Sequence, residues 1–286
     1  MESISFPVFL GSSAKEIPEQ FYIHLFAIGA LLCELGHWQT QNVRDPFWRF
    51  YWNLDEGAFV TLGDGSRFLI PAQQCCLIPS GVHFSCGQSA AFRHFYVHFD
   101  VLGLPLLAQR RLFDAPRAYV PYPEESGELL ALAQSVAVLD KDTKAPLSLS
   151  AAIQAKVIIL RTLGAALAER QETVPIVSGE FPGLVALLEW IESKLETPLS
   201  VSQLAERCHL SPDYFSRCFK RSLGQSVGDY IRERRIARAA QRLLFSHDSI
   251  EQIAHNCGFA NRFYFSRVFT DQMGIPPATY RKQIPA

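Results

Sequence analysis

The chain contains one phrase twice, and this repeat restricts the possible fold more than any other feature of the sequence. Residues 214–220 read YFSRCFK, and residues 264–270 read YFSRVFT, 50 positions later. The similarity extends on both sides, because LAERCHLSPDYFSRCFKRSLGQSVGDYIR (204–232) is matched by IAHNCGFANRFYFSRVFTDQMGIPPATYR (253–281). A match of this length indicates one supersecondary unit that is present in two copies.

Helix start and stop signals recur at matching places in the two copies. Each copy begins with a serine three residues before a glutamine, which is the capping-box pattern. After a tight turn, a second N-cap residue precedes a second helix that ends at a glycine. The expected start residues are Ser200, Ser211, Ser226, Ser249 and Asn261, and the expected glycines are Gly224, Gly258 and Gly274. The pattern predicts two helix-turn-helix units, at about 200–222 and 249–273, joined by a longer helix.

The second helix of each unit has an apolar face and a polar face with an arginine at its centre. An α-helix fits the major groove of DNA, and arginine reads guanine through two acceptors on the base edge. Any surface helix has a polar face, but two matched helices joined by the cationic segment RERRIARAAQR (232–242) favour DNA binding. The candidate DNA-binding residues are Asp213, Ser216, Arg217, Lys220, Asn261, Arg262, Phe263, Ser266 and Arg267.

Two of these candidates have more than one possible role. Asp213 stands four positions before Arg217, so it either orients that arginine or accepts a hydrogen bond from a cytosine amine. Phe263 either contacts a thymine methyl group or only fixes the entry of the chain into the helix. The sequence leaves both alternatives open.

The distribution of charge agrees with a polyanionic partner for the C-terminal part. Residues 1–180 hold 13 Lys and Arg against 18 Asp and Glu, whereas residues 181–286 hold 14 against 10. The formal charges are therefore −5 and +4, although the whole chain carries only −1. A basic half on a nearly neutral chain indicates double-stranded DNA as the partner of that half.

Residues 184–282 resemble the DNA-binding domain of the AraC/XylS family of bacterial transcription regulators. The segment SIEQIAHNCGFANRFYFSRVFTDQMGIPPATYR carries I-A, then G-F, then Y-F-S-R-x-F, then G-x-x-P-x-x-Y-R. The resemblance implies that one monomer inserts two reading helices into successive segments of the major groove. The positions that face bases in the family are matched here by Asp213, Ser216, Arg217, Arg262, Phe263 and Arg267.

The N-terminal part predicts a β domain followed by helices. Runs such as FRHFYVHFD (92–100) alternate and are rich in aromatic residues, and turn signals separate them. Helical patterns follow at 124–140 and 147–170. RDPFWRFYWNLDEGAFVTLGDGSRFLIPAQQCCLIPSGVHFSC (44–86) and HFYVHFDV (94–101) resemble the cupin-like jelly-roll sensor domain of the same family. The expected fold is therefore α+β, with a cupin-like β jelly-roll barrel and C-terminal helices, then an all-α domain.

The expected organisation has a sensing and dimerisation domain at 1–170, a linker at 171–182 and a DNA-binding domain at 183–286. The linker segment has two prolines, a glycine and no hydrophobic periodicity. The helix at 147–170 carries an apolar stripe, which packs either on its own domain or on a partner subunit. The stripe consists of Ile153, Val157, Leu160, Leu163 and Leu167.

The barrel predicts a binding pocket rather than an active site. A metal-dependent cupin needs about three imidazoles and a carboxylate, yet no histidine lies between His37 and His83, and His94 and His98 only alternate along one strand. No nucleophile motif or phosphate loop is apparent, so we expect no catalysis, no metal and no cofactor. Aromatic faces with an arginine suit a sugar or another small polar ring. The candidate ligand-binding residues are Arg44, Trp48, His83, Phe84 and Tyr96.

The sequence as a whole predicts a cytoplasmic, homodimeric transcription regulator that responds to a small molecule. By family habit we expect an activator, which makes RNA polymerase a partner. The seven cysteines have no disulfide or zinc spacing, and no signal peptide or membrane partner is expected. Two alternatives stay open: a metal-dependent cupin enzyme with an appended DNA-binding module, and a constitutive regulator whose barrel binds no ligand.

Overall fold

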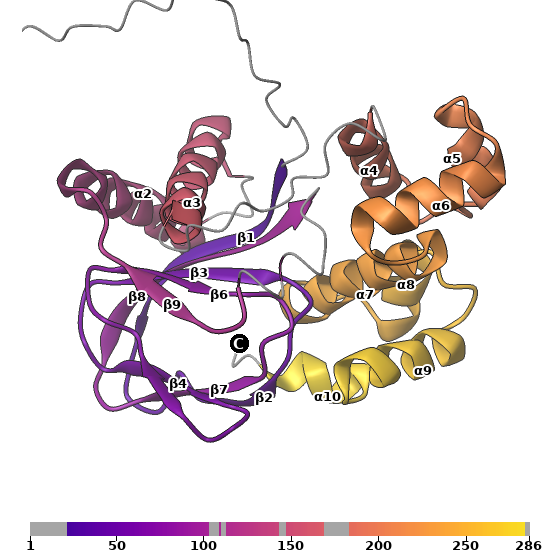
Figure 1. Cartoon of the computed structure of the whole chain (residues 1–286). Coiled ribbons are helices and arrows are strands. Elements are labelled where there is room, and N and C mark those ends of the chain that lie inside the picture. The colour runs from indigo at the N-terminus through magenta and orange to yellow at the C-terminus, as the bar shows by residue number, and fades with distance from the viewer. Residues whose placement is uncertain (1–21, 103–108, 110–112, 143–146, 169–182, 284–286) are drawn as a thin grey trace, which may run out of the picture.

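The computed structural model has a sheet-rich N-terminal region and a helical C-terminal domain that packs against it (Figure 1). The structure describes residues 22–102, 109, 113–142, 147–168 and 183–283. The predicted linker at 171–182 lies outside the described residues. The coarse prediction of a β region followed by an all-α domain is confirmed.

Two antiparallel sheets form the N-terminal region, which we call the two-sheet domain (residues 22–119). The first sheet has the order β1 (Tyr22–Cys33), β8 (Phe92–Leu102), β3 (Trp48–Asn53), β6 (Cys75–Ile78) and β9 (Arg117–Tyr119). The second has the order β2 (Thr40–Val43), β7 (Phe84–Gln88), β4 (Ala58–Leu62) and β5 (Arg67–Leu69). The inner faces of both sheets contribute to one apolar cluster, so the sheets pack face to face.

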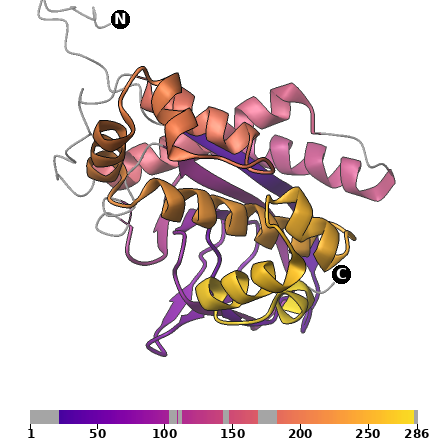
Figure 2. The same ribbon diagram turned by 90° about the vertical axis from the view of Figure 1, so that its right-hand side faces the viewer.

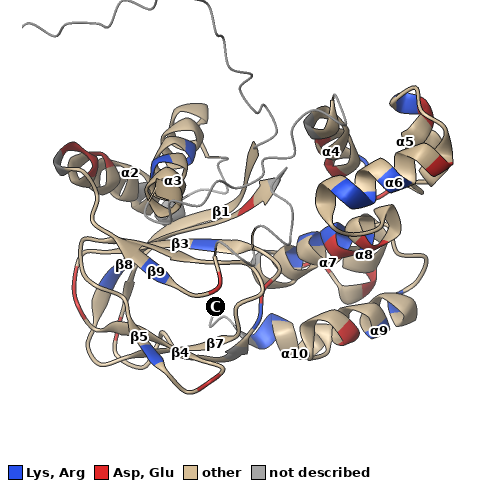
Figure 3. Ribbon diagram, viewed as in Figure 1, with Lys and Arg blue, Asp and Glu red and all other residues tan. Residues whose placement is uncertain are grey.

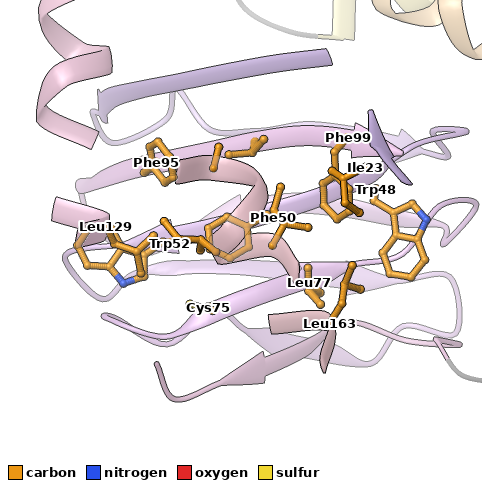
Figure 4. Close-up of a cluster of buried hydrophobic side chains, with 14 of the residues drawn as sticks. Ile23, Trp48, Phe50, Trp52, Cys75, Leu77, Phe95, Phe99, Leu129 and Leu163 are labelled. Atoms are coloured by element: carbon orange, nitrogen blue, oxygen red, sulfur yellow. The ribbon is translucent and has the colours of Figure 1, made fainter. Parts of the chain in front are cut away.

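Alternation along the strands divides their side chains between two clusters. On β3, Trp48, Phe50 and Trp52 point away from the second sheet, whereas Tyr51 points between the sheets. The outward side chains pack under α2 (Pro123–Asp142) and α3 (Leu149–Ala168), as Figure 4 shows for Trp52 and Leu129. The first sheet is therefore buried on both faces.

The space between the sheets is filled by aromatic rings along β8. The ring of His94 stacks on that of Tyr96, with the ring centroids 5.6 Å apart, and the rings of Tyr96 and His98 follow with centroids 5.0 Å apart. The Tyr96 ring lies over Gly29 of β1, where an added Cβ would be 2.5 Å from the ring. Glycine is therefore required at this position by close packing, and the tyrosine occupies the interior of the domain.

Stability of the two-sheet domain should depend on pH through these buried histidines. Burial, with a smaller contribution from Arg49, lowers the pKa of His94 to about 3, and its Nδ1 lies 2.7 Å from Asn53 Oδ1. The unfolded chain binds a proton at this residue below about pH 6.5 and the folded chain does not. The free energy of unfolding should therefore fall as the pH drops from 6.5 towards 3, by up to about 1.4 kcal/mol per pH unit.

Urea denaturation at pH 7 and pH 5 tests this expectation. His94→Gln should flatten the dependence on pH, because it removes one group that binds protons only in the unfolded state. The matched control is His37→Gln, since the His37 side chain is 68% exposed. An equal change of slope in both variants would contradict the assignment to His94.

The C-terminal domain consists of seven α-helices and a short 3-10 helix in the described part of the chain. Its capping boxes at Ser200 and Ser249 and the N-caps at Ser211, Ser226 and Asn261 are all formed, which confirms the predicted helix starts. The elements are α4 (Leu184–Ser193), α5 (Val201–Arg207), α6 (Pro212–Leu223), α7 (Val227–Phe245), α8 (Ile250–Asn256), α9 (Arg262–Met273), α10 (Pro277–Tyr280) and the 3-10 helix Arg281–Gln283.

Candidate nucleic-acid interface

Two helix-turn-helix units, α5–α6 and α8–α9, lie on either side of the connecting helix α7 (Figures 1 and 2). Each unit has its own apolar core. In the first, Ala205 packs with Phe215 and Phe219, and in the second, Ala254 packs with Phe265 and Phe269. The repeated phrase therefore supplies the same inward-facing residues to both second helices.

The turns of the two units use different residues in the same left-handed conformation. Gly258 has a φ of 78° and His209 has a φ of 56°. Both turns thus adopt the left-handed conformation, and the first unit does so at a non-glycine residue. Such a residue carries some backbone strain, because its Cβ crowds the backbone in this region.

The outward faces of α6 and α9 carry most of the predicted DNA-binding residues in exposed positions. Arg217 and Arg267 occupy matching exposed sites, and Phe263 is 76% exposed. Figure 3 shows basic residues along α6 and α9 in the helical domain. The exposed members of the predicted set are Asp213, Arg217, Lys220, Asn261, Arg262, Phe263 and Arg267, and the half-buried members are Ser216 and Ser266.

Two of the candidates, Ser216 and Asn261, are engaged within the helices themselves. The Ser216 hydroxyl donates to the carbonyl of Pro212 at 2.8 Å. The Asn261 side chain accepts from the Tyr264 amide at 2.8 Å and so caps α9. Among the described residues, no ion pair joins Asp213 to Arg217, so both roles given above for Asp213 stay predictions. Ser216 and Asn261 are thus poorer candidates for direct base contacts than the arginines.

Sequence reasoning missed one pair of exposed aromatic residues. Tyr214 and Tyr264 open the two copies of YFSR, and neither is among the predicted DNA-binding residues. They are 47% and 42% exposed, while Phe215 and Phe265 are fully buried. The guanidinium of Arg267 lies 5.5 Å from the centre of the Tyr264 ring. The spacing of Phe215, Cys218 and Phe219 could have revealed this, because it excludes position 214 from the apolar face.

The arginines of the cationic segment 232–242 make contacts within the protein. Arg235 donates from Nε to the Leu195 carbonyl at 2.9 Å, and Arg242 pairs with Asp248 at 2.9 Å. Arg234 is buried and pairs with Glu192 and Asp100. These arginines hold the helical domain together and attach it to the first sheet, so the two recognition helices supply the candidate base contacts.

The five predicted ligand-binding residues lie in three different places. Trp48 lies on the outer face of the first sheet, with its Nε1 3.2 Å from Gln109 Oε1, so it does not face the interior. Phe84 and Tyr96 lie between the sheets. Arg44 and His83 line a cleft of about 770 Å³ between the two-sheet domain and the helical domain. The structure therefore brings together Arg44 with His83, and Phe84 with Tyr96, but not all five.

The histidines of β8 contact neighbouring side chains within the two-sheet domain. Within the described ranges, no group of three or more His, Cys, Asp or Glu side chains is placed to hold a metal ion. His94 instead bonds to Asn53, and His98 packs against Phe47 with ring centroids 5.2 Å apart. The structure thus gives both residues a packing role.

Comparisons with known proteins agree with this geometry. The helix-turn-helix domain family matches residues 204–283. The multiple antibiotic resistance protein MarA of Escherichia coli is 38% identical over 96 residues, which cover 34% of this chain and 76% of MarA. The regulatory protein SoxS of Escherichia coli is 35% identical over 98 residues, which cover 34% of this chain and 92% of SoxS.

A solved structure resembles almost the whole chain. A crystal structure of apo ToxT from Vibrio cholerae matches with a TM-score of 0.51 and 12% sequence identity, covering 95% of this chain and 100% of that one. At this identity the likeness shows the fold alone. It extends the similarity from the helical domain to the sheet-rich region.

Proposed function

The chain belongs to the AraC family of DNA-binding transcription regulators, and from this premise we propose that it regulates transcription in response to a small molecule. The observation that carries the proposal is the pair of matched helices, α6 and α9, with Arg217 and Arg267 exposed at equivalent positions. Each arginine offers two donors to one guanine edge. Because the other exposed residues differ between the helices, the two halves of the DNA site should differ in sequence.

In vitro selection of DNA sequences with the purified full-length chain tests this function. A single enriched motif with two different halves, spaced by about one helical turn, is the expected result. Binding that persists on any sequence and disappears with added salt would indicate only non-specific attraction to phosphates. Fusion of the selected site to a reporter promoter would then show whether the protein activates transcription with RNA polymerase, as we propose.

The two-sheet domain is proposed to be a cupin-like sensor, within residues 1–170, for a sugar or another small polar molecule. The support is the cleft that contains Arg44 and His83, which both the two-sheet domain and the helical domain line. A ligand bound there would shift the balance between arrangements of the two domains, because its affinity depends on both.

A thermal-shift screen with sugars tests the sensor proposal. A ligand at about 100 times its dissociation constant should stabilise the protein by about 2.7 kcal/mol. Arg44→Ala should abolish the shift for a cleft ligand, and Tyr96→Phe should change it for a ligand between the sheets. Failure of every compound would favour the constitutive alternative, and stoichiometric metal in the purified protein would favour the enzyme.

We propose that the protein forms a homodimer through α3. The helix buries one face on its own sheet, including Ala155, Ile159 and Leu163. The predicted stripe is therefore divided, because Leu163 is buried while Ile153 remains 52% exposed. The exposed apolar residues of α3 follow one another at helical spacing: Leu149, Ile153, Val157 and Leu160. A second copy of the same stripe would cover them by knobs-into-holes packing.

Replacing Ile153 by glutamate should therefore dissociate the dimer. The charge would lie in the centre of the apolar interface, where it cannot be hydrated, and should raise the dissociation constant by roughly 100-fold. Sedimentation equilibrium measures the effect directly. Gln154→Glu is the matched control, because it adds the same charge at the next exposed position of α3. A monomeric wild-type protein would contradict the proposed dimer.

A further inference from the structure

The second helix-turn-helix unit is completed by side chains from the two-sheet domain, and the first unit is not. Phe47, between β2 and β3, is 1% exposed and belongs to the same core as Phe265, Phe269 and Tyr280. Phe26 of β1 packs against this core as well. In contrast, the core of the first unit is built only from residues between 184 and 231, as far as the structure describes the chain.

A buried polar contact accompanies Phe47. The Tyr280 hydroxyl donates to one oxygen of Asp45, and the other oxygen of Asp45 pairs with the Arg49 guanidinium. All three side chains are buried. Burial raises the pKa of Tyr280 well above its ordinary value, so the hydroxyl remains a proton donor. Loss of this donor would leave a buried carboxylate oxygen short of one partner, which is costly.

The internal repeat shows that this contact is specific to the second unit. Tyr230 occupies the position in the first unit that Tyr280 occupies in the second, and both are buried. The Tyr230 hydroxyl has no hydrogen-bond partner in the described part of the chain. Of these two equivalent tyrosines, only Tyr280 donates a hydrogen bond to the two-sheet domain in the described part of the chain.

Arg49 connects this contact to the interior of the two-sheet domain. Its guanidinium lies 5.0 Å from the centre of the Phe47 ring and 5.3 Å from the centre of the Phe84 ring. Phe84 lies between the two sheets. A movement of Phe84 would thus displace the cation that holds Asp45 in place, and with it the acceptor of Tyr280.

We propose that Asp45, Phe47 and Arg49 form a coupling element that makes the second helix-turn-helix unit, and not the first, respond to the state of the two-sheet domain. The element acts through its contact with Tyr280, and this contact sets the stability and the placement of α9. Helix α7 keeps its place when α9 shifts, because Arg234 of α7 pairs with Asp100 of β8 and with Glu192 of α4. The functional consequence rests on the DNA-binding function proposed above, but the coupling itself does not.

Hydrogen–deuterium exchange of the full chain tests the coupling without DNA. Tyr280→Phe keeps the ring in the core and removes only the hydroxyl, so amides of α8–α10 should exchange about tenfold faster or more. Amides of α5 and α6 should be unchanged. Tyr230→Phe is the matched control and should accelerate neither unit, because that hydroxyl has no bond to lose. Phe47→Leu should reproduce the Tyr280→Phe pattern without altering a polar group.

Two results would overturn the proposal. One is unchanged exchange of α8–α10 in both Tyr280→Phe and Phe47→Leu. The other is an equal acceleration in the first and second units, which would indicate general loosening of the domain. Failure of the wild-type chain to select a DNA motif would refute the proposed function but would leave the exchange result intact.

A second measurement tests the consequence for DNA. The affinity of Asp45→Asn is measured for the selected motif and for motifs with single base substitutions. In the half read by α9, the loss of affinity caused by a substitution should differ several-fold from that in the wild-type protein. Asp45→Asn should leave the response to substitutions in the half read by α6 unchanged. Equal effects on both halves would contradict the assignment of the coupling to the second unit.

Discussion

Gly258→Ala should destabilise the helical domain by about 3 kcal/mol or more. Gly258 has a φ of 78°, and an alanine Cβ at this position would be 2.2 Å from the Leu195 carbonyl oxygen and 2.8 Å from the Arg235 guanidinium. The clash is with backbone at the end of α4, so no side-chain rotation relieves it. The two Arg235 hydrogen bonds, to the carbonyls of Leu195 and Thr197, would also be disturbed. Urea denaturation followed by helical circular dichroism measures the loss.

Gly274→Ala is the matched control for the backbone conformation alone. Gly274 has a φ of 77°, but an added Cβ there meets nothing within 4 Å. Its cost should therefore be about 1 kcal/mol, from the left-handed conformation only. The reverse change, His209→Gly, should be neutral or slightly stabilising, because it relieves strain at a φ of 56°. Equal losses for Gly258→Ala and Gly274→Ala would contradict the importance of the Leu195 contact.

Arg267→Ala should weaken binding to the selected DNA by about 1–3 kcal/mol and relax specificity at one base pair. The Arg267 guanidinium is exposed and lies over the Tyr264 ring, which restricts the conformations of the side chain before DNA arrives. Less conformational entropy is then lost on binding a guanine. Fluorescence anisotropy with the selected site and with single-base variants separates loss of affinity from loss of specificity.

The pattern across sequences decides which kind of contact Arg267 makes. A uniform loss on every sequence, with a reduced salt slope, would identify a phosphate contact in place of a base contact. Arg161→Ala is the matched control, because it removes the same charge from helix α3, where Arg161 pairs with Glu125 and Glu128 of α2. An equal loss in this control would show that the effect is one of net charge only.

Sequence reasoning predicted the helical domain well because its signals are local. Ser200 and Ser249 begin helices through contacts three residues away, and the spacing of Phe265, Val268 and Phe269 defines a buried face within one helix. The sheets were predicted only as a class, because strand order depends on pairings such as that of β1 with β8, about 70 residues apart.

The candidate ligand site was predicted less well, for the same reason. Trp48 and Tyr51 are both aromatic residues of one strand, and only the pairing of that strand decides which of them faces the interior. The contact between Asp45 and Tyr280 could not be predicted at all, since it joins residues 235 positions apart in the sequence. Its one signal was a charged pair, Asp45 and Arg49, in an otherwise apolar stretch.

The separation of Asp45 from Tyr280 by 235 positions has a consequence for biosynthesis. The strand pairings of the two-sheet domain all lie within residues 22–119, and the helices that cover its first sheet end at Ala168, so these parts can form while the C-terminal helices are still being made. Phe47 then remains on its surface until the last helices are synthesised. The second helix-turn-helix unit thus covers an apolar patch that other nascent chains could otherwise bind, and a chain truncated before α8 should depend on chaperones to stay in solution.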